Sequence, residues 1–299
     1  MNNTFSDHLF EYRSVEKKKL MMSLYITSIV MFVELIGGYI THSIALISDA
    51  GHMFTHCFAI GLSLIAILIA RRPPCHQKTF GLYRAEILAA FINGLFLLLV
   101  VGVILYEAAL RIIHPREILG LHMLIIAFIG LAVNIASIFI LHGNHKEDLN
   151  IKSVFYHMIA DTASSVGIIL AAIIISFTGW NTLDPIVSIG ISLVILYWSW
   201  GVLKESTAIL LEMPPSGVDI NSISDDLKMN FPEIVEINNV HLWAITANML
   251  VFSAHIKINT NGNSSMIQNI LVKKVNKHLA NQYKIAESTI QITLQDYEL

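Results

Sequence analysis

Two short stretches of the sequence carry side chains that bind transition metals. His52 and His56 lie four residues apart, and His157 and Asp161 repeat that spacing much later in the chain. On an α-helix, residues at positions i and i+4 project from the same face. Imidazole and carboxylate groups in a set of four suit a tetrahedral transition metal. The spacing therefore predicts two facing helices that bring these four side chains to one metal ion.

The composition places these helices in a membrane. Hydrophobic residues make up 55% of the chain and charged residues 14%, and the mean hydropathy is +0.63. Nearly uncharged windows of about 18 or more residues indicate membrane-spanning helices. Such windows occur at residues 20–39, 43–70, 87–106, 119–141, 154–177 and 185–202. We therefore expect an α-helical, multi-pass membrane protein with six transmembrane helices.

The basic residues predict how the chain is oriented. Lys and Arg gather before the first window, between the second and third, between the fourth and fifth, and after the sixth. An excess of these residues marks the cytoplasmic side, so both termini should be cytoplasmic. The two cysteines, Cys57 and Cys75, give no disulfide framework. We expect membrane lipid as a partner and no nucleic acid.

Two acidic residues accompany the candidate ligands inside the apolar windows. Glu34 either has a functional role, as intramembrane acids often do, or makes a structural hydrogen bond to another helix. Asp49 lies one turn before His52 and either binds the metal or orients a ligand imidazole. We favour the orienting role for Asp49. In the loop that follows, Cys75 and His76 are either a weak metal pair or ordinary surface residues.

The chain changes character after Met213. Residues 1–19 form a cytoplasmic lead-in, residues 20–212 the membrane domain, and residues 213–299 a more polar, alternating segment. In this last segment we expect a helix capped by Asp219 and ending at Asn230, strands at 234–245 and 249–258, a helix from 264 or 265 to 282, and a strand at 289–294. The order αββαβ predicts an α+β layer with helices on one face of a sheet. About 85 residues bury only a modest core, which favours dimerisation.

Several motifs together resemble the cation diffusion facilitator family, in the branch of zinc transporters and bacterial cobalt–zinc–cadmium resistance exporters. The similar stretches are residues 42–53, 79–81 with 84–90, 157–161, and 184–186 with 203–206. The resemblance covers nearly the whole chain. It implies six transmembrane helices, a cytoplasmic ferredoxin-like C-terminal domain, a homodimer, and metal–proton antiport by alternating access. It also implies no permanently bound cofactor and, as the location, the bacterial inner membrane.

The same resemblance implies a transport site of two residues from the second helix and two from the fifth. These positions are His52, His56, His157 and Asp161, and the transported ion would be zinc, or cobalt, nickel or cadmium. Zinc-transporting relatives usually have aspartate where this chain has His56. With Asp161 as the one carboxylate, a divalent ion leaves a residual charge of about +1, which is unfavourable away from water. Either Asp49 or Glu34 then compensates, or affinity falls.

The ligand types limit the choice of metal and suggest how protons take part. Three imidazoles suit Zn, Co, Ni or Cu much better than Mg or Ca. Histidine titrates near pH 6.5 and must be neutral to bind a metal. Protons arriving from the acidic side can therefore displace the ion. This linkage predicts exchange of metal for protons.

The C-terminal domain carries part of the family's regulatory metal equipment. His255 matches a family ligand position, and His241 matches a common histidine that need not bind metal. Asp296 is a further candidate in this domain, and Cys75 and His76 are further candidates in the loop between the second and third apolar windows. Other expected histidines are replaced, by Asn238 and Leu294 among others, so the domain is expected to serve mainly in dimerisation.

Two other classes of function remain open. A membrane-embedded metalloenzyme would need a general base beside the metal, and Asp49 is the one obvious candidate. No HExxH pattern is present, so we do not expect an enzyme. The other class is a metal sensor or scaffold that has lost transport along with the missing aspartate. Metal efflux from loaded vesicles separates this class from an exporter.

Overall fold

The computed structural model describes residues 17–70, 72, 75–141, 149–246, 249–259 and 265–294; within these, it describes side chains in 25–136, 161–259 and 268–293. The described chain forms two compact units. One contains residues up to 62 together with 92–201, and the other contains 63–91 together with the residues from 202 onward. The predicted lead-in at 1–19 lies almost wholly outside the described residues.

Long helices account for every predicted apolar window. They are α2 (Lys17–Thr41), α3 (Ile44–Ala70), α4 (Arg84–Ile113), α5 (Gly120–Leu141), α6 (Leu149–Thr178) and α7 (Leu183–Leu210). Helices α4 and α7 continue beyond the predicted ends, because a search for uncharged residues stops where a helix becomes polar. In α4 the extension contains an ion pair one turn apart, between Arg111 Nε and Glu107 Oε1 at 3.3 Å, which supports helical structure there.

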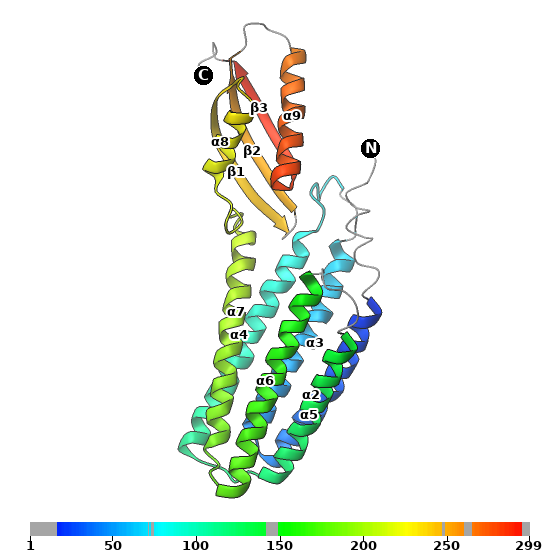
Figure 1. Cartoon of the computed structure of the whole chain (residues 1–299), viewed down its shortest axis with the longest axis vertical. Helices are drawn as coiled ribbons and strands as arrows, with labels where there is room; N and C mark the ends of the chain where they lie inside the picture. The colour runs from blue at the N-terminus through cyan, green and yellow to red at the C-terminus, as the bar shows by residue number, and fades with distance from the viewer. Residues whose placement is uncertain are drawn as a thin grey trace. The chain divides into compact units, whose positions relative to one another are not determined.

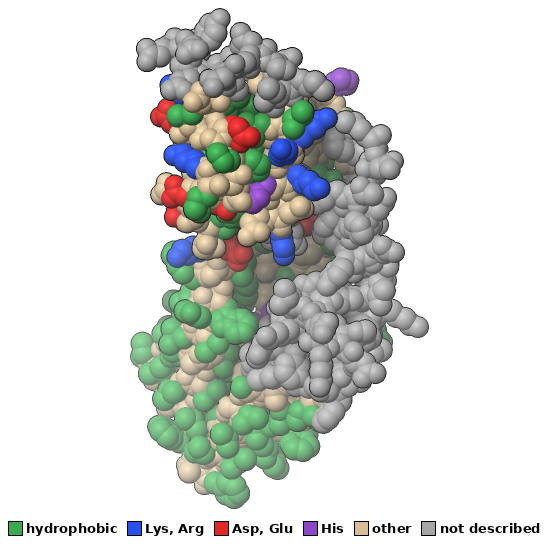
Figure 2. Space-filling view, turned by 45° about the horizontal axis from the view of Figure 1, so that its top comes forward, with side chains coloured by type: hydrophobic (Ala, Val, Ile, Leu, Met, Phe, Trp, Pro, Cys, Tyr) green, Lys and Arg blue, Asp and Glu red, His purple; other side chains and the backbone are tan. Residues whose placement is uncertain are grey.

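The helical part has the surface of a membrane protein. Among the described residues, four segments are long and apolar enough to cross a membrane: Ile44–Ala70, Arg84–Ile113, Asp161–Thr178 and Leu183–Leu210. Two further apolar segments are shorter, Tyr25–Thr41 and Gly120–Ala136. Figure 2 shows hydrophobic side chains over the visible face of the helices, whereas acidic and basic side chains gather on the sheet-containing part. Exposed apolar surface on this scale suits contact with lipid.

The two helices that carry the candidate ligands share one core. Buried residues of α3, α5 and α6 form a single cluster, with Ala45 from α3 and Ala171 and Ala172 from α6 at most 1% exposed. Small side chains let membrane helices approach closely. Helix α5 also packs against α2. This packing fixes α3 beside α6.

The C-terminal segment folds in the predicted order αββαβ. Helix α8 (Ile220–Asn230) is followed by β1 (Ile234–Thr246), β2 (Met249–Ile258), α9 (Ser265–Tyr283) and β3 (Ile285–Leu294). Strands β1 and β2 are antiparallel, and β2 pairs in parallel with β3. The predicted start of β3 at residue 289 is wrong, because pairing with β2 begins at Ile285. Residues 285–288 show no clear alternation of apolar and polar side chains, so the strand cannot be recognised there from its own sequence.

One face of this sheet forms the core of the domain. Helix α8 packs on β1 and α9 on β3, and Ile223, Phe252, Val275 and Leu279 are at most 1% exposed. Asp219 caps α8 as predicted, because its side chain accepts a hydrogen bond from the Asn221 amide. The helices therefore lie on one face of the sheet.

A partly exposed hydrogen bond between the side chains of His278 in α9 and Asp226 in α8 gives this domain a pH dependence. His278 Nε2 donates to Asp226 Oδ2 at 2.6 Å, and this hydrogen bond lowers the pKa of Asp226 below its usual value. A carboxylate with a lowered pKa stabilises the fold above its ordinary pKa of about 4 and stops doing so as the pH falls through the lowered value. We expect His278→Ala to reduce hydrogen-exchange protection of α8 at pH 7, with the difference shrinking below about pH 4.

The control for that measurement is Lys277→Ala, which alters an exposed neighbour on the same helix. It should leave the protection of α8 unchanged at both pH values. Equal protection in His278→Ala and the unaltered chain at pH 7 would show that this hydrogen bond does not stabilise the domain.

Candidate metal centre

Helix α3 brings two imidazoles together, one turn apart. His52 Nε2 and His56 Nε2 lie 3.0 Å apart, and the rings meet edge to face with centroids 4.4 Å apart. Thr55 donates its hydroxyl to the His52 carbonyl at 2.6 Å. The pair is therefore held on one face of the helix, as the spacing predicts.

Helix α6 supplies a carboxylate to the same place. Asp161 Oδ1 lies 3.4 Å from His52 Nε2, and one ligand atom from each of His52, His56 and Asp161 lies within 4.8 Å of the others. With zinc–nitrogen bonds of about 2.0–2.1 Å, ligand atoms of a tetrahedral ion stand about 3.3 Å apart. The His52–His56 and His52–Asp161 separations match this spacing, and the whole group of three lies within 4.8 Å.

The fourth predicted ligand is placed only by its backbone. His157 lies in α6, one turn before Asp161, and its side chain is outside those described. The structure therefore brings together three of the four predicted side chains, and the fourth stays a prediction.

Asp49 connects the two ligand-bearing helices. Its carboxylate is 2% exposed and accepts hydrogen bonds from Ser164 at 2.8 Å and Ser165 at 3.4 Å. Each serine hydroxyl also lies within hydrogen-bond distance of the Asp161 carbonyl, at 2.8 and 3.0 Å, so its single proton is shared between the two acceptors. Among the described residues, Asp49 therefore bonds to the serine hydroxyls of α6 one turn after Asp161, and not to a ligand imidazole as the sequence favoured.

Glu34 in α2 is a second fully buried acid near this network. Its side chain is 1% exposed, and its carboxyl neighbours that of Asp49. Gly130 of α5 faces the Glu34 carboxyl so closely that any Cβ there would collide with it. The absence of a side chain at residue 130 therefore makes the room that this acid occupies.

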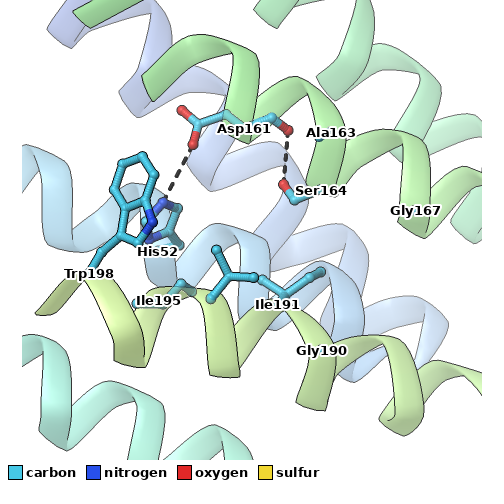
Figure 3. Close-up of a pocket in the computed structure, with 10 residues that line it drawn as sticks. His52, Asp161, Ala163, Ser164, Gly167, Gly190, Ile191, Ile195 and Trp198 are labelled. Atoms are coloured by element: carbon cyan, nitrogen blue, oxygen red, sulfur yellow. Dashed lines mark hydrogen bonds and ion pairs between the residues drawn. The ribbon is translucent and has the colours of Figure 1, made fainter. Parts of the chain in front are cut away.

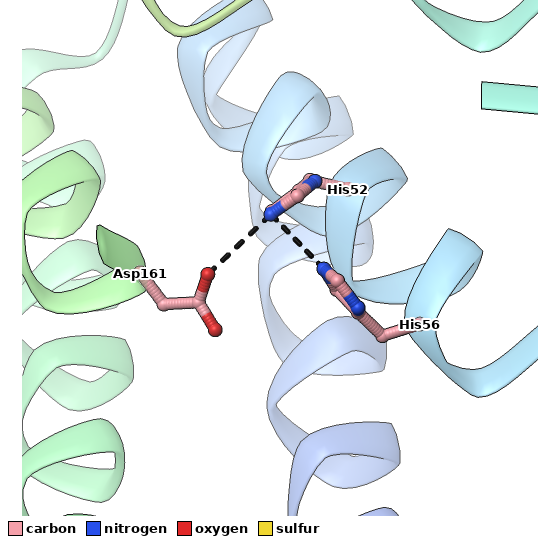
Figure 4. A group of neighbouring side chains, drawn as sticks. All are labelled: His52, His56 and Asp161. Atoms are coloured by element: carbon pink, nitrogen blue, oxygen red, sulfur yellow. Dashed lines mark hydrogen bonds and ion pairs between the residues drawn. The ribbon is translucent and has the colours of Figure 1, made fainter. Parts of the chain in front are cut away.

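A cavity opens beside the candidate ligands. It has a volume of about 350 Å³, and His52 and Asp161 form part of its wall. The rest is mostly apolar or small, and includes Gly167 of α6 and Gly190 and Trp198 of α7. Figure 3 shows the Trp198 indole beside His52. The cavity reaches two of the three side chains, His52 and Asp161, from between α6 and α7.

Comparison with known proteins shows what kind of protein has this arrangement. Residues 20–211 match the cation efflux transmembrane domain, and residues 215–293 match the cytoplasmic domain of cation efflux proteins. The chain belongs to the cation efflux family. The family resemblance seen in the sequence is thereby confirmed, and the chain is a multi-pass membrane protein with a cytoplasmic domain that contains a small sheet.

Curated relatives in this cation efflux family are similar over most of their length. The zinc transporter ZitB of Yersinia pestis is 38% identical over 93% of this chain and 88% of its own. A cadmium, cobalt and zinc/H(+)-K(+) antiporter of Bacillus velezensis is 39% identical over 92% and 88%. The metal cation efflux system protein CzcD of Cupriavidus metallidurans is 35% identical over 97% and 91%. All three are named for transport and none for catalysis, which agrees with the expectation that the chain is not an enzyme.

The candidate regulatory ligands are dispersed in this cation efflux protein. Cys75 and His76 lie in an exposed tight turn between α3 and α4, closed by paired backbone hydrogen bonds between Cys75 and Lys78. His241 on β1 is exposed, and His255 on β2 contacts the Asn239 amide at 3.4 Å. Among the described residues, none of these joins a group of three metal ligands. Asp296 lies outside the described residues.

Sequence reasoning missed the serines and the tryptophan of the site. Ser164 and Ser165 are small polar residues in an apolar helix, a pattern that usually indicates helix packing, and their partner Asp49 is far away in sequence. Nothing in the spacing of Trp198 connects it with His52. Both contacts depend on which helix faces turn toward each other.

Proposed function

We propose that this protein exports divalent transition metals, zinc above all, from the cytoplasm in exchange for protons. The observation that carries the proposal is the convergence of His52, His56 and Asp161 within 4.8 Å beside a cavity. These donors suit zinc, cobalt or nickel and disfavour hard ions. The names of the relatives, which include zinc transporters and a cadmium, cobalt and zinc/H(+)-K(+) antiporter, support the same cargo.

We infer that His157 completes a site with three imidazoles and one carboxylate. Such a site holds a divalent ion with a residual charge of about +1, and apolar surroundings disfavour that charge. The buried acids Asp49 and Glu34, at 2% and 1% exposure, are the groups that compensate. The metal is the cargo, and no resident cofactor enters the proposal.

Proton exchange follows from the chemistry of these ligands. An imidazole binds metal only when it is neutral, so protonation on the acidic side releases the ion. The helices then return with protons in place of metal, and the site opens to each side in turn. Movement of α7 relative to α3 and α6 would open and close the cavity next to His52.

The finer architecture belongs to the same proposal. Six long helices, α2 and α5 included, cross the membrane, and both termini are cytoplasmic. The chain divides into a cytoplasmic segment at 1–19, a membrane domain at 20–212 and a cytoplasmic domain at 213–299. The αββαβ domain has a ferredoxin-like fold and joins two copies in a homodimer. The bacterial inner membrane is the expected location, as the bacterial relatives suggest.

Flux through purified protein in lipid vesicles tests the proposal directly. With a pH gradient imposed, zinc should enter the vesicles while protons leave, and cobalt, nickel and cadmium should be compared with iron and manganese. Empty vesicles give the background. Zinc binding without flux above that background would favour the sensor or scaffold alternative, because that class keeps the ligands without transport.

We also expect the link between α3 and α6 to matter for metal affinity. Asp49→Asn should weaken apparent zinc affinity by roughly 10–100-fold, the range typical for groups that orient metal ligands, because the amide no longer accepts both serine hydroxyls as a carboxylate does. The measurement is the zinc concentration for half-maximal flux. Ser176→Ala is the control, since among the described residues that exposed serine donates to Ala172 within its own helix. Unchanged affinity in Asp49→Asn would remove Asp49 from the site.

A further inference from the structure

Two sequence motifs that the metal site leaves unexplained meet in the structure. One begins at His42 and leads into α3, and the other, at Asp184, opens α7. The Asp184 side chain is 0% exposed. Its carboxylate accepts hydrogen bonds from the Ser43 hydroxyl at 2.5 Å, the Ile44 amide at 2.7 Å and the Ala45 amide at 3.1 Å. The start of α3 is thus capped by a residue 140 positions away in the chain.

The cap satisfies the whole first turn of α3. The first amides of an α-helix have no partner inside the helix, and a side chain just before the helix usually accepts from one of them. Here the Ser43 hydroxyl accepts a hydrogen bond from the Leu46 amide at 3.2 Å, and the Asp184 carboxylate accepts from the two preceding amides, those of Ile44 and Ala45. A carboxylate at this place also complements the positive end of the helix dipole.

The turn before α3 is fixed from a second side. His42 adopts a left-handed backbone conformation, with φ 60°, which is uncommon for a residue other than glycine. Arg111 at the end of α4 donates to the His42 carbonyl and to Glu107 Oε1, and it is 8% exposed. Buried charged groups from α4 and α7 therefore hold this end of α3 in one position.

We propose that Asp184 is a positioning residue for the metal site. It acts by fixing the start of α3, the helix that carries His52 and His56. The inference rests on the proposed transport function. His52 lies about 12 Å along the helix from Ile44, at 1.5 Å per residue, so a rotation or slip of α3 at the cap moves His52 and His56 together. Asp161, on α6, would not follow. Loss of the cap should therefore disturb the geometry of the ligand set while leaving every ligand present.

Cobalt binding to the purified full-length protein tests this proposal. Tetrahedral cobalt gives an electronic spectrum that depends on ligand geometry, and titration gives its affinity. In Asp184→Ala we expect an altered spectrum and a roughly 10–100-fold weaker affinity, since small displacements from remote changes have effects of this size. Asp184→Asn keeps an oxygen acceptor and should recover part of both. Ser43→Ala leaves the two amide contacts in place and gives a smaller change in the same direction.

The matched control is Asp219→Ala, which removes an ordinary helix cap in the C-terminal domain. It should leave the cobalt spectrum and affinity unchanged. A folded Asp184→Ala or Ser43→Ala protein with an unaltered spectrum and unaltered affinity would overturn the positioning role, even if its thermal stability were reduced. If the unaltered protein gave no tetrahedral cobalt spectrum, the proposed function itself would fail.

Discussion

Replacing Asp161 with asparagine should reduce zinc-dependent proton flux to the level of empty vesicles. Asparagine has nearly the same shape, so the fold is kept, but it removes the one carboxylate among the three convergent side chains. A divalent ion would then face neutral ligands in a partly dehydrated site, which is strongly unfavourable. We expect the flux to fall by more than roughly 100-fold, beyond the usual effect of altering a group that only orients a ligand.

Asp225→Asn makes the same chemical change on the exposed face of α8 and should transport normally. Measuring zinc and proton flux in both variants separates loss of the site from loss of folded protein. Flux in Asp161→Asn comparable to that of Asp225→Asn would show that the converging residues are not the transport site.

Changing His56 to aspartate should make transport more resistant to acid. Each imidazole that must lose a proton before binding lowers metal affinity about tenfold per pH unit below its pKa. Aspartate stays ionised down to about pH 4, so the variant loses one of these proton dependences. The added negative charge also brings the site with a divalent ion to formal neutrality. We expect tighter zinc binding in His56→Asp, with an advantage that grows about tenfold per unit as the pH falls below 6.

The zinc concentration for half-maximal flux, measured from pH 5.5 to 7.5 and repeated with cobalt, nickel and cadmium, checks this expectation. His114→Asp, at an exposed position just after α4, controls for an added acid elsewhere. A pH profile and metal preference identical to those of the unaltered chain would mean that His56 does not set selectivity.

The site was predictable where its chemistry follows a helical repeat. The spacing of His52 and His56 predicts one face of one helix, and the structure has it. The αββαβ order was also predictable, because caps and alternating strands are local signals. The hydrogen bonds from Ser164 and Ser165 to Asp49, and the cap from Asp184 to α3, were not. Each depends on which faces of distant helices meet, and a single sequence carries no local signal of that pairing.

The cavity beside His52 has a consequence for how the ion travels. A Cβ added at Gly167 or Gly190 would meet no atom within 4 Å, so both glycines border open space. Most of the other residues in the cavity wall are apolar. Apart from His52 and Asp161, the Ser164 hydroxyl is the one side-chain oxygen among the described residues of this wall that could replace a water ligand of the ion. The ion must therefore shed most of those waters at His52 and Asp161. Exchange of water for protein ligands would then be concentrated in one step, and metals that release water slowly should cross more slowly than their affinities suggest.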